Sequence, residues 1–397
     1  MSTPSDETPE DICPRPSEPP SLATAPLSPP IHLASVYRCE SPAQADRILG
    51  GDGDGYVYAR DGHPNADLLA AKCRELHAAD HAAIAASGMA ALALAVLAHL
   101  QTGDHVVASR QLYGKSLALL EGESGRLGIM STRVDTCNLN AVRAALTERT
   151  RLIVVETITN PILRVSDLGA LADMAHERGA ALLVDNTLAG PVVCRPHEFG
   201  ADFVLESLTK SMNGHSDVVL GLLTGKGDVW RRVPGVLSAW GLASSPFDCW
   251  LALRGLSTHA IRAEKACHNA LAIARWLAKQ PQVETVHYAG LIGHPDYALA
   301  RRQFGERFGS MVTITLRHGR AAAESFIASA RDVPFCPSLG ELSTTLSHPQ
   351  STSHRGLTES DRVALGIFGG TIRLSIGIES VEHIQASLAA GLARIED

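Results

Sequence analysis

Residues 152–185 read LIVVETITNPILRVSDLGALADMAHERGAALLVD, and their pattern sets the architecture expected of the whole chain. Two short apolar runs, 152–156 and 181–185, flank a segment in which apolar residues recur at helical spacing. Ser166 is expected to cap this helix and Gly179 to end it. A strand, a helix and a second strand in this order predict a parallel sheet covered by helices.

The same alternation extends from about residue 64 to residue 225. HVVAS (105–109) and DFVLES (202–207) are further strand candidates. Ala82–Leu100 is long enough to raise the question of a membrane span, but it is mostly alanine and is interrupted by Ser87 and Gly88. We expect a buried core helix there and no contact with a membrane.

The pattern changes beyond about residue 256. The elements expected in this part are a long helix, a strand, a second helix and a half-buried strand, at residues 260–279, 311–316, 321–330 and 371–379. The sequence therefore predicts an α/β protein with a large domain at residues 64–256 and a smaller C-terminal α/β domain at residues 257–397.

Composition excludes several classes of protein. The 397 residues carry a net charge of −7, which argues against a nucleic-acid partner. The eight cysteines are scattered without a CxxC motif, and no metal-ligand spacing occurs among the cysteines and histidines. We therefore expect free thiols, a cytoplasmic location and no metal site. Residues 1–30 hold many prolines and no signal-peptide pattern, and they are expected to form a disordered tail.

Polar residues stand at the ends of three predicted strands. Glu156, Asp185 and Ser207 each close an apolar run and precede a polar loop. Ligands of open α/β sheets bind outside the carboxyl ends of the strands. A site is therefore expected where the loops TITNP (157–161, preceded by Glu156), DNT and LTK converge.

Lys210 and Asp185 suggest the chemistry of that site. A lysine directly after a buried strand is partly desolvated, which lowers its pKa and lets its amine form a Schiff base. Asp185 would need a cation, and the ring nitrogen of pyridoxal 5'-phosphate (PLP) is one. The alternatives are an ordinary loop lysine and a strand-end aspartate that caps a turn.

Three further positions fit such a site. Gly88, at the start of a predicted helix, suits a phosphate, and the alternative is a tight turn. Arg373 lies in an apolar strand, where it would pair with a substrate carboxylate or form a structural ion pair. Tyr113 could stack on an aromatic cofactor or belong to the core.

Taken together, these motifs resemble the Cys/Met-metabolism (trans-sulfuration) family of PLP-dependent enzymes, over residues 31–397. The matching segments are ASGMAA (86–91), VDNT (184–187), SLTKSMNGHSDVVLG (207–221), SPFDCWLALRGLSTHAIR (245–262), SLG (338–340), HPQSTSHRGL (348–357) and IRLSIGIE (372–379). The resemblance implies PLP-dependent transferase fold type I, with a mostly parallel seven-stranded sheet between helices and a smaller C-terminal domain.

The resemblance also implies a role for each site residue. Lys210 would form the Schiff base and move protons, and Tyr113 would stack on the ring and assist the leaving group. The cofactor would further contact Gly88, Met89, Glu156, Asn160, Asp185, Ser207 and Thr209, while Ser338 and Arg373 would orient the amino-acid substrate. Residues 31–63 would form an arm that places Tyr58 and Arg60 at a neighbouring subunit's site, in a homotetramer built as a dimer of dimers.

The implied activity is γ-elimination or γ-replacement on homoserine- or homocysteine-derived amino acids, of the cystathionine γ-synthase or γ-lyase type. Departures from the family pattern bear on the substrate, because Lys115 stands in the loop after Tyr113 and Pro337 precedes the SLG segment. Lys115 would place a cation near the substrate side chain. The alternatives are an O-acetylhomoserine sulfhydrylase, a methionine γ-lyase-like enzyme, a γ-replacement enzyme of a specialised pathway, or a catalytically silent scaffold.

Overall fold

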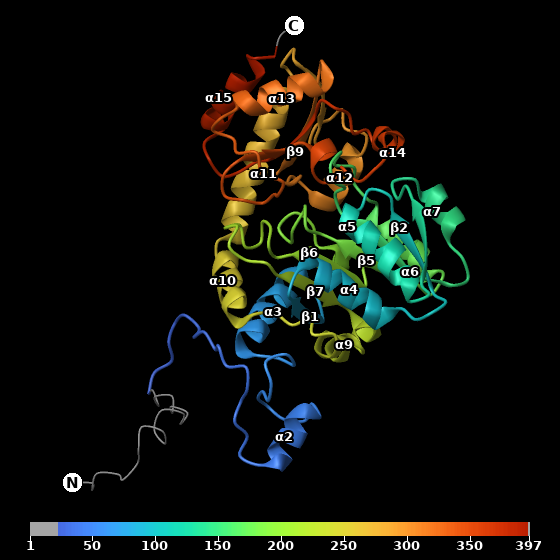
Figure 1. Cartoon of the computed structure of the whole chain (residues 1–397), viewed down its shortest axis with the longest axis vertical. Helices are drawn as coiled ribbons and strands as arrows, with labels where there is room; N and C mark the ends of the chain where they lie inside the picture. Colours follow the sequence, from blue (N-terminus) through green and yellow to red (C-terminus); the bar gives the residue numbers. More distant parts are fainter. Residues whose placement is uncertain (1–22, 396–397) are drawn as a thin grey trace, which may run out of the picture. The chain divides into compact units, whose positions relative to one another are not determined.

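The computed structural model describes residues 23–395 and contains two β-sheets (Figure 1). Of the predicted tail, residues 1–22 lie outside the described residues, and residues 23–30 form no helix or strand. Of the described residues, those from 31 onward form one compact unit. Both sheets belong to this unit, so the predicted large and small parts of the chain are each built on a sheet of their own.

The first sheet has seven strands in the order β1-β7-β6-β5-β4-β2-β3. Neighbouring strands from β3 to β6 run parallel, whereas β7 is antiparallel to both β6 and β1. This is the mostly parallel seven-stranded sheet that was expected. The strands are β1 (His81–Ala85), β2 (His105–Ser109), β3 (Met130–Val134), β4 (Thr150–Glu156), β5 (Ala181–Asp185), β6 (Phe203–Ser207) and β7 (Gly221–Gly225).

Helices cover both faces of this sheet. Successive strand residues point to opposite faces, so Leu183 packs in the core beside α4 (Gly88–His99), while Leu182 and Val184 pack in the core beside α8 (Leu168–His176). The other helices of this part are α2 (Pro42–Leu49), α3 (Pro64–His77), α5 (Gly114–Leu117), α6 (Ser124–Arg126), α7 (Leu139–Ala145), α9 (Val233–Ala239) and α10 (Pro246–Leu256).

The second sheet is antiparallel, with the order β10-β11-β9-β8. Its strands are β8 (Val283–His287), β9 (Met311–Leu316), β10 (Thr345–Ser347) and β11 (Thr371–Ser375). The long helix α11 (His259–Leu277) runs from α10, beside the first sheet, to α13 and α15 near the second (Figure 1). The remaining helices are α12 (Tyr297–Phe304), α13 (Gly319–Ser329), α14 (Glu359–Ala364) and α15 (Val381–Leu392).

Three local predictions differ from the structure. Asp167, not Ser166, caps α8, and the Ser166 hydroxyl donates to the carbonyl of Glu156 instead. The helix expected within Ala82–Leu100 begins at Gly88 as predicted, but the start of that segment is not helical, because it pairs with β7 as part of strand β1. The strand expected over residues 371–379 ends at Ser375 and is fully buried rather than half-buried, since it lies between β9 and β10. The predicted domain boundaries at 64–256 and 257–397 stay predictions.

Candidate active site

A cavity of about 350 Å³ lies at the carboxyl ends of β4, β5 and β6. It is the place where the three polar loops were expected to converge. Eleven of the predicted site residues line it: Gly88, Met89, Tyr113, Glu156, Asn160, Asp185, Ser207, Thr209, Lys210, Ser338 and Arg373. Its size and its few convergent polar groups are typical of a site for a small molecule.

Lys210 enters the cavity from the turn that follows β6. The turn is closed by hydrogen bonds from Lys210 N–H to the Ser207 carbonyl (3.1 Å) and from Gly214 N–H to the Lys210 carbonyl (2.8 Å). At the tip, Nζ donates to Ser338 Oγ at 2.8 Å. Burial, and then the charge of Arg373, lower the pKa of the Lys210 amine. A lowered pKa increases the fraction of neutral, nucleophilic amine at a given pH.

Asp185 ends β5 on the same side of the sheet. Its Oδ1 accepts two hydrogen bonds from Thr187, one from the backbone N–H (3.0 Å) and one from the hydroxyl (2.6 Å). The same Thr187 hydroxyl accepts from Ser207 N–H at 3.0 Å, which ties the loop after β5 to the end of β6. Burial raises the pKa of Asp185, and the bonds from Thr187 oppose that rise. A cation in the cavity would favour the ionised form of this carboxyl.

Glu156, at the end of β4, holds two cavity residues in place. Its Oε1 accepts from Tyr113 N–H at 2.8 Å, and its Oε2 accepts from Asn160 N–H at 3.0 Å. The side chain is buried, and burial followed by the charge of Asp185 raises its pKa. The Glu156 carboxyl therefore sets the backbone positions of the two loops that carry Tyr113 and Asn160.

Arg373 reaches the cavity from β11, in the second sheet. Its Nη1 donates to Asn160 Oδ1 at 2.8 Å, and its Nη2 donates to the Ser338 carbonyl at 2.9 Å. Its Nε is buried and has no hydrogen-bond partner among the described residues. Burial lowers the pKa of Arg373 to about 10, so the guanidinium stays charged at neutral pH. Such a cation is suited to a carboxylate ligand.

The start of α4 and the turn after β6 form one wall of the cavity. The Ser87 hydroxyl caps the helix by accepting from Ala90 N–H at 3.0 Å, and Gly88 and Met89 follow. A Cβ atom at Gly88 would lie 3.1 Å from Ser207 Cβ, so glycine keeps this wall open. Thr209 lines the cavity, but its hydroxyl donates to the Leu220 carbonyl and accepts from Leu220 N–H.

Three predicted site residues do not line this cavity. Tyr58 is 42% exposed, and the guanidinium of Arg60 lies 5.2 Å from the centre of its ring. Lys115 is exposed, whereas its neighbour Ser116 lines the cavity. The expected roles of all three stay predictions.

The cavity also has lining residues that received no role from the sequence. They include Thr187, Leu188, Val219, Thr352 and Ser353. The last two lie in the HPQSTSHRGL segment, which was noticed only as a resemblance. Its position beside the cavity depends on the tertiary arrangement of segments that are far apart in the chain, which no local pattern shows.

Within residues 23–395, no group of three or more His, Cys, Asp or Glu side chains could hold a metal ion. Over the same part of the chain, every helix is too short or too polar to cross a bilayer.

Comparisons with known proteins agree with this geometry. The profile of the family described as "Cys/Met metabolism PLP-dependent enzyme" matches residues 15–393. An L-methionine gamma-lyase of Porphyromonas gingivalis is 38% identical over 92% of each chain. An O-succinylhomoserine sulfhydrylase of Pseudomonas aeruginosa is 37% identical, over 92% of this chain and 90% of the relative.

A crystal structure of cystathionine gamma synthase from Xanthomonas oryzae pv. oryzae, in complex with aminoacrylate and cysteine, has a similar fold. It superposes with a TM-score of 0.87 and 37% identity, over 93% of each chain. Together with the seven-stranded sheet, the smaller antiparallel sheet and the lysine at the strand ends, these matches show that the chain belongs to the Cys/Met-metabolism family of PLP-dependent enzymes.

Proposed function

We propose that this enzyme eliminates or replaces the Cγ substituent of an amino acid derived from homoserine or homocysteine. The observation that carries the proposal is the meeting of Lys210 Nζ, Asp185 and Arg373 in one cavity. These three groups supply an amine, a carboxylate partner for a ring cation and an anchor for a carboxylate. The named relatives, a methionine gamma-lyase and an O-succinylhomoserine sulfhydrylase, support this class of substrate.

The cavity fits PLP by the chemistry of its walls. Thr187 occupies only Oδ1 of Asp185, so the other carboxylate oxygen would be available to a protonated ring nitrogen. The start of α4, a helix of twelve residues, suits a phosphate because its first N–H groups have no partner within the helix. Ser207 adds a hydroxyl, and Thr209 would have to turn its hydroxyl away from Leu220 to do the same.

When bound, PLP supplies an aldehyde that condenses with an amine, with loss of water, and a ring that accepts electrons from bonds at the attached carbon. The residues of this chain supply the proton transfers. A substituent on Cγ cannot be expelled by removing one proton from Cα, so the base must serve more than one carbon. Lys210 Nζ, on a four-carbon side chain and with a lowered pKa, is suited to take a proton at Cα and return it elsewhere.

The substrate is proposed to be held through its α-carboxylate by Arg373, whose Nε donor has no partner among the described residues. Ser338 joins this contact to the amine, because its carbonyl accepts from Arg373 Nη2 and its hydroxyl accepts from Lys210 Nζ. Tyr113 would stack on the cofactor ring and assist the leaving group. Lys115 is kept as a candidate for contact with the substrate side chain.

We further propose a cytoplasmic homotetramer in which the arm at residues 31–63 completes a neighbour's site. Tyr58 and Arg60 support this, because they are close together, largely exposed and outside the cavity of their own chain. The guanidinium of Arg60 and the phenol of Tyr58 could both contact a phosphate held at the start of α4 in another subunit.

A substrate panel tests the proposal. The purified enzyme with PLP is incubated with O-acetylhomoserine, O-succinylhomoserine, cystathionine and methionine, with and without a thiol. Release of 2-oxobutanoate indicates elimination, and a new thioether indicates replacement. Lys210→Ala is the matched control and should form neither. Absence of product from every substrate, with PLP bound, would reject this substrate class.

A further inference from the structure

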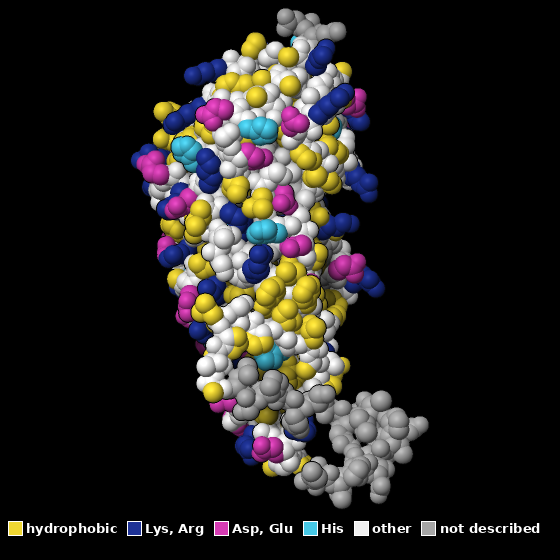
Figure 2. Space-filling view, turned by 90° about the vertical axis from the view of Figure 1, so that its left-hand side faces the viewer, with side chains coloured by type: hydrophobic (Ala, Val, Ile, Leu, Met, Phe, Trp, Pro, Cys, Tyr) yellow, Lys and Arg dark blue, Asp and Glu magenta, His cyan; other side chains and the backbone are white. Residues whose placement is uncertain are grey.

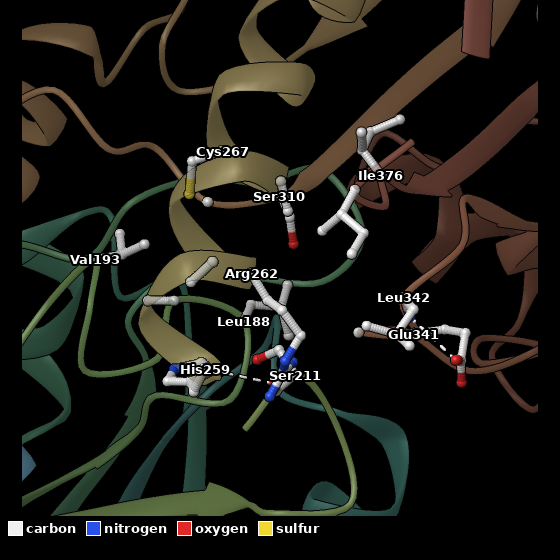
Figure 3. A pocket seen from close by; sticks show the side chains of 16 residues that line it. Leu188, Val193, Ser211, His259, Arg262, Cys267, Ser310, Glu341, Leu342 and Ile376 are labelled. Carbon is white, nitrogen blue, oxygen red and sulfur yellow. Dashed lines mark hydrogen bonds between the residues drawn. The ribbon is translucent and has the colours of Figure 1, made fainter. Parts of the chain in front are cut away.

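Arg262 is a buried cation in the first turn of α11. It is 9% exposed, and it lies beside the small cavity that Figure 3 shows, between α11 and the segment Gly340–Leu342. In that view its side chain points toward Ser211. The guanidinium is therefore directed at the polypeptide that immediately follows Lys210.

The guanidinium of Arg262 donates most of its hydrogen bonds to backbone carbonyl oxygens of that segment. Nη1 donates to Ser211 O at 2.7 Å, and Nη2 donates to Met212 O at 3.0 Å and to Asn213 O at 3.1 Å. Nη2 also lies 2.8 Å from Gly255 O, so one of its two N–H groups is shared between two carbonyl oxygens. Three consecutive carbonyls after Lys210 are thus held by one rigid, planar group.

Two other contacts hold the guanidinium and its target. Arg262 Nε donates to the Thr258 hydroxyl at 3.0 Å, which fixes the plane of the guanidinium. One ring nitrogen of His259, Nδ1, lies 3.2 Å from Ser211 O (Figure 3). The pKa of His259 is lowered to about 4 by burial and then by the charge of Arg262, so the ring is neutral at pH 7 and adds no second positive charge.

Glycine allows this close approach on both sides of the turn. Gly214 has φ +79°, and a Cβ atom there would overlap Arg262 Nη1. Gly340 has φ +82°, and a Cβ atom there would overlap the backbone nitrogen of Ser211. The residue after Lys210 is therefore enclosed between Arg262 and the loop that carries Ser338.

We propose that Arg262 is the positioning residue for Lys210. By fixing the carbonyls of residues 211–213, it fixes the direction in which the Lys210 side chain leaves the backbone, and so keeps Nζ at Ser338 Oγ. The inference rests on the proposed role of Lys210. Arg262 touches neither substrate nor cofactor in this assignment, and it acts only through the backbone.

The fork of the guanidinium is essential to this role. A lysine at position 262 would keep the positive charge but would present one nitrogen, which cannot bridge three carbonyls and Gly255 O at once. Arg262→Lys therefore separates the effect of charge from the effect of geometry. Arg262→Ala removes both, and it leaves a space next to the existing cavity that free guanidinium can occupy.

The experiment compares wild type, Arg262→Lys and Arg262→Ala as PLP-loaded full-length enzymes. The readouts are the pH midpoint of the cofactor absorbance change, the fraction of Lys210 that carries cofactor after borohydride reduction and mass spectrometry, and the separate values of kcat and KM. We expect both variants to shift the absorbance midpoint and to lower kcat by about 10-fold or more, with KM changed less than about 3-fold. Millimolar guanidinium should restore the midpoint in Arg262→Ala and should leave the wild type unchanged.

Asn269→Ala is the matched control for loss of stability. Asn269 lies on the same helix and donates to the carbonyls of Gly377 (2.9 Å) and Glu379 (2.8 Å), far along the helix from Lys210. This variant should lower the melting temperature without shifting the absorbance midpoint. Should Arg262→Ala fail to fold, Arg262→Lys carries the test alone.

The two proposals fail differently. If wild-type enzyme carries no borohydride-fixed cofactor at Lys210, the proposed function is wrong. If it does, and if Arg262→Lys and Arg262→Ala match the wild-type midpoint and kcat while only their melting temperatures fall, the positioning role of Arg262 is overturned and the proposed function stands.

Discussion

Lys210 Nζ donates a 2.8 Å hydrogen bond to Ser338 Oγ, although 128 positions separate the two residues in the chain. Lys210 follows β6 of the first sheet, and Ser338 precedes β10 of the second. The same Ser338 accepts from Arg373 Nη2 through its carbonyl. Ser338 therefore links the Lys210 amine to the Arg373 guanidinium, which is proposed to bind the substrate carboxylate.

Ser338→Ala should remove the hydrogen bond from Lys210 Nζ and keep the bond from Arg373, because that bond is made to the backbone carbonyl. A hydrogen bond to a charged or strongly polar group contributes about 1.5–3 kcal/mol, so we expect kcat/KM to fall by about 10- to 100-fold. Steady-state kinetics on the best substrate of the panel measures the change. Ser257→Ala, which removes an exposed hydroxyl bonded to the Leu253 carbonyl, is the control and should leave kcat/KM unchanged.

Glu156→Gln should reduce the affinity for PLP. The amide keeps one acceptor but turns an N–H donor toward either Tyr113 N–H or Asn160 N–H, which displaces one of the two loops. We expect the dissociation constant of PLP to rise by about 10-fold or more, measured by equilibrium dialysis. Glu121→Gln is the control, because Glu121 also accepts two bonds, from Arg133, but at the surface. An equal effect in both variants would count against the bridging role of Glu156.

His354 should make folding pH-dependent. Burial, followed by the charge of Arg373, lowers the pKa of His354 to about 4, against about 6.5 in the unfolded chain. Between these values the unfolded chain binds more protons, so this residue costs stability as the pH falls from about 6.5 to about 4, by up to about 1.4 kcal/mol per pH unit.

The test is the difference in free energy of unfolding between wild type and His354→Asn, from urea titrations at several pH values. Asparagine can still accept the bond that Nδ1 makes with the Ser353 hydroxyl. The difference should change steadily with pH below about 6.5 and stay constant between pH 7.5 and 8.5. A difference that is constant throughout would show that His354 does not titrate in this way.

Mixing two inactive variants tests the shared site. If Arg60 of one subunit serves Lys210 of another, Lys210→Ala and Arg60→Ala should each have little activity, and their co-expressed mixture should recover about a quarter of the wild-type activity. Recovery arises because half of randomly formed dimers are hybrid and each hybrid has one intact site. A mixture no more active than its components would contradict the proposed arrangement. Light scattering of the wild type gives the number of subunits.

The central strands were readily predicted from sequence. HVVAS, ALLVD and MVTITL match β2, β5 and β9 residue for residue. Buried strands are continuous apolar runs of branched side chains, and they leave a strong local signal. The position of the cavity could also be predicted, from the polar residues at the ends of β4, β5 and β6. A parallel sheet brings the carboxyl ends of its strands to one edge.

Other features could not be predicted from local sequence, because they depend on contacts with residues elsewhere in the chain. The alanines of β1 suit a helix equally well, and pairing with β7 decides the matter. Ser166 and Asp167 can both cap a helix, and the choice follows from the carbonyl of Glu156, which takes the Ser166 hydroxyl. Arg262 lay within a segment noted only for its resemblance, since its target carbonyls are about fifty positions away.

The two sheets contribute different side chains to the cavity. The first supplies Lys210 and Asp185, and the second, through β11 and the segment before β10, supplies Arg373 and Ser338. A fragment that stopped after β7 would keep the amine and its carboxylate neighbour but would lack both groups that are proposed to recognise an amino acid. The lysine proposed for the reaction and the arginine proposed to bind the substrate carboxylate would thus come from two distant stretches of the chain, and a change in the stretch that carries Arg373 and Ser338 could alter substrate binding while Lys210 and Asp185 stay the same.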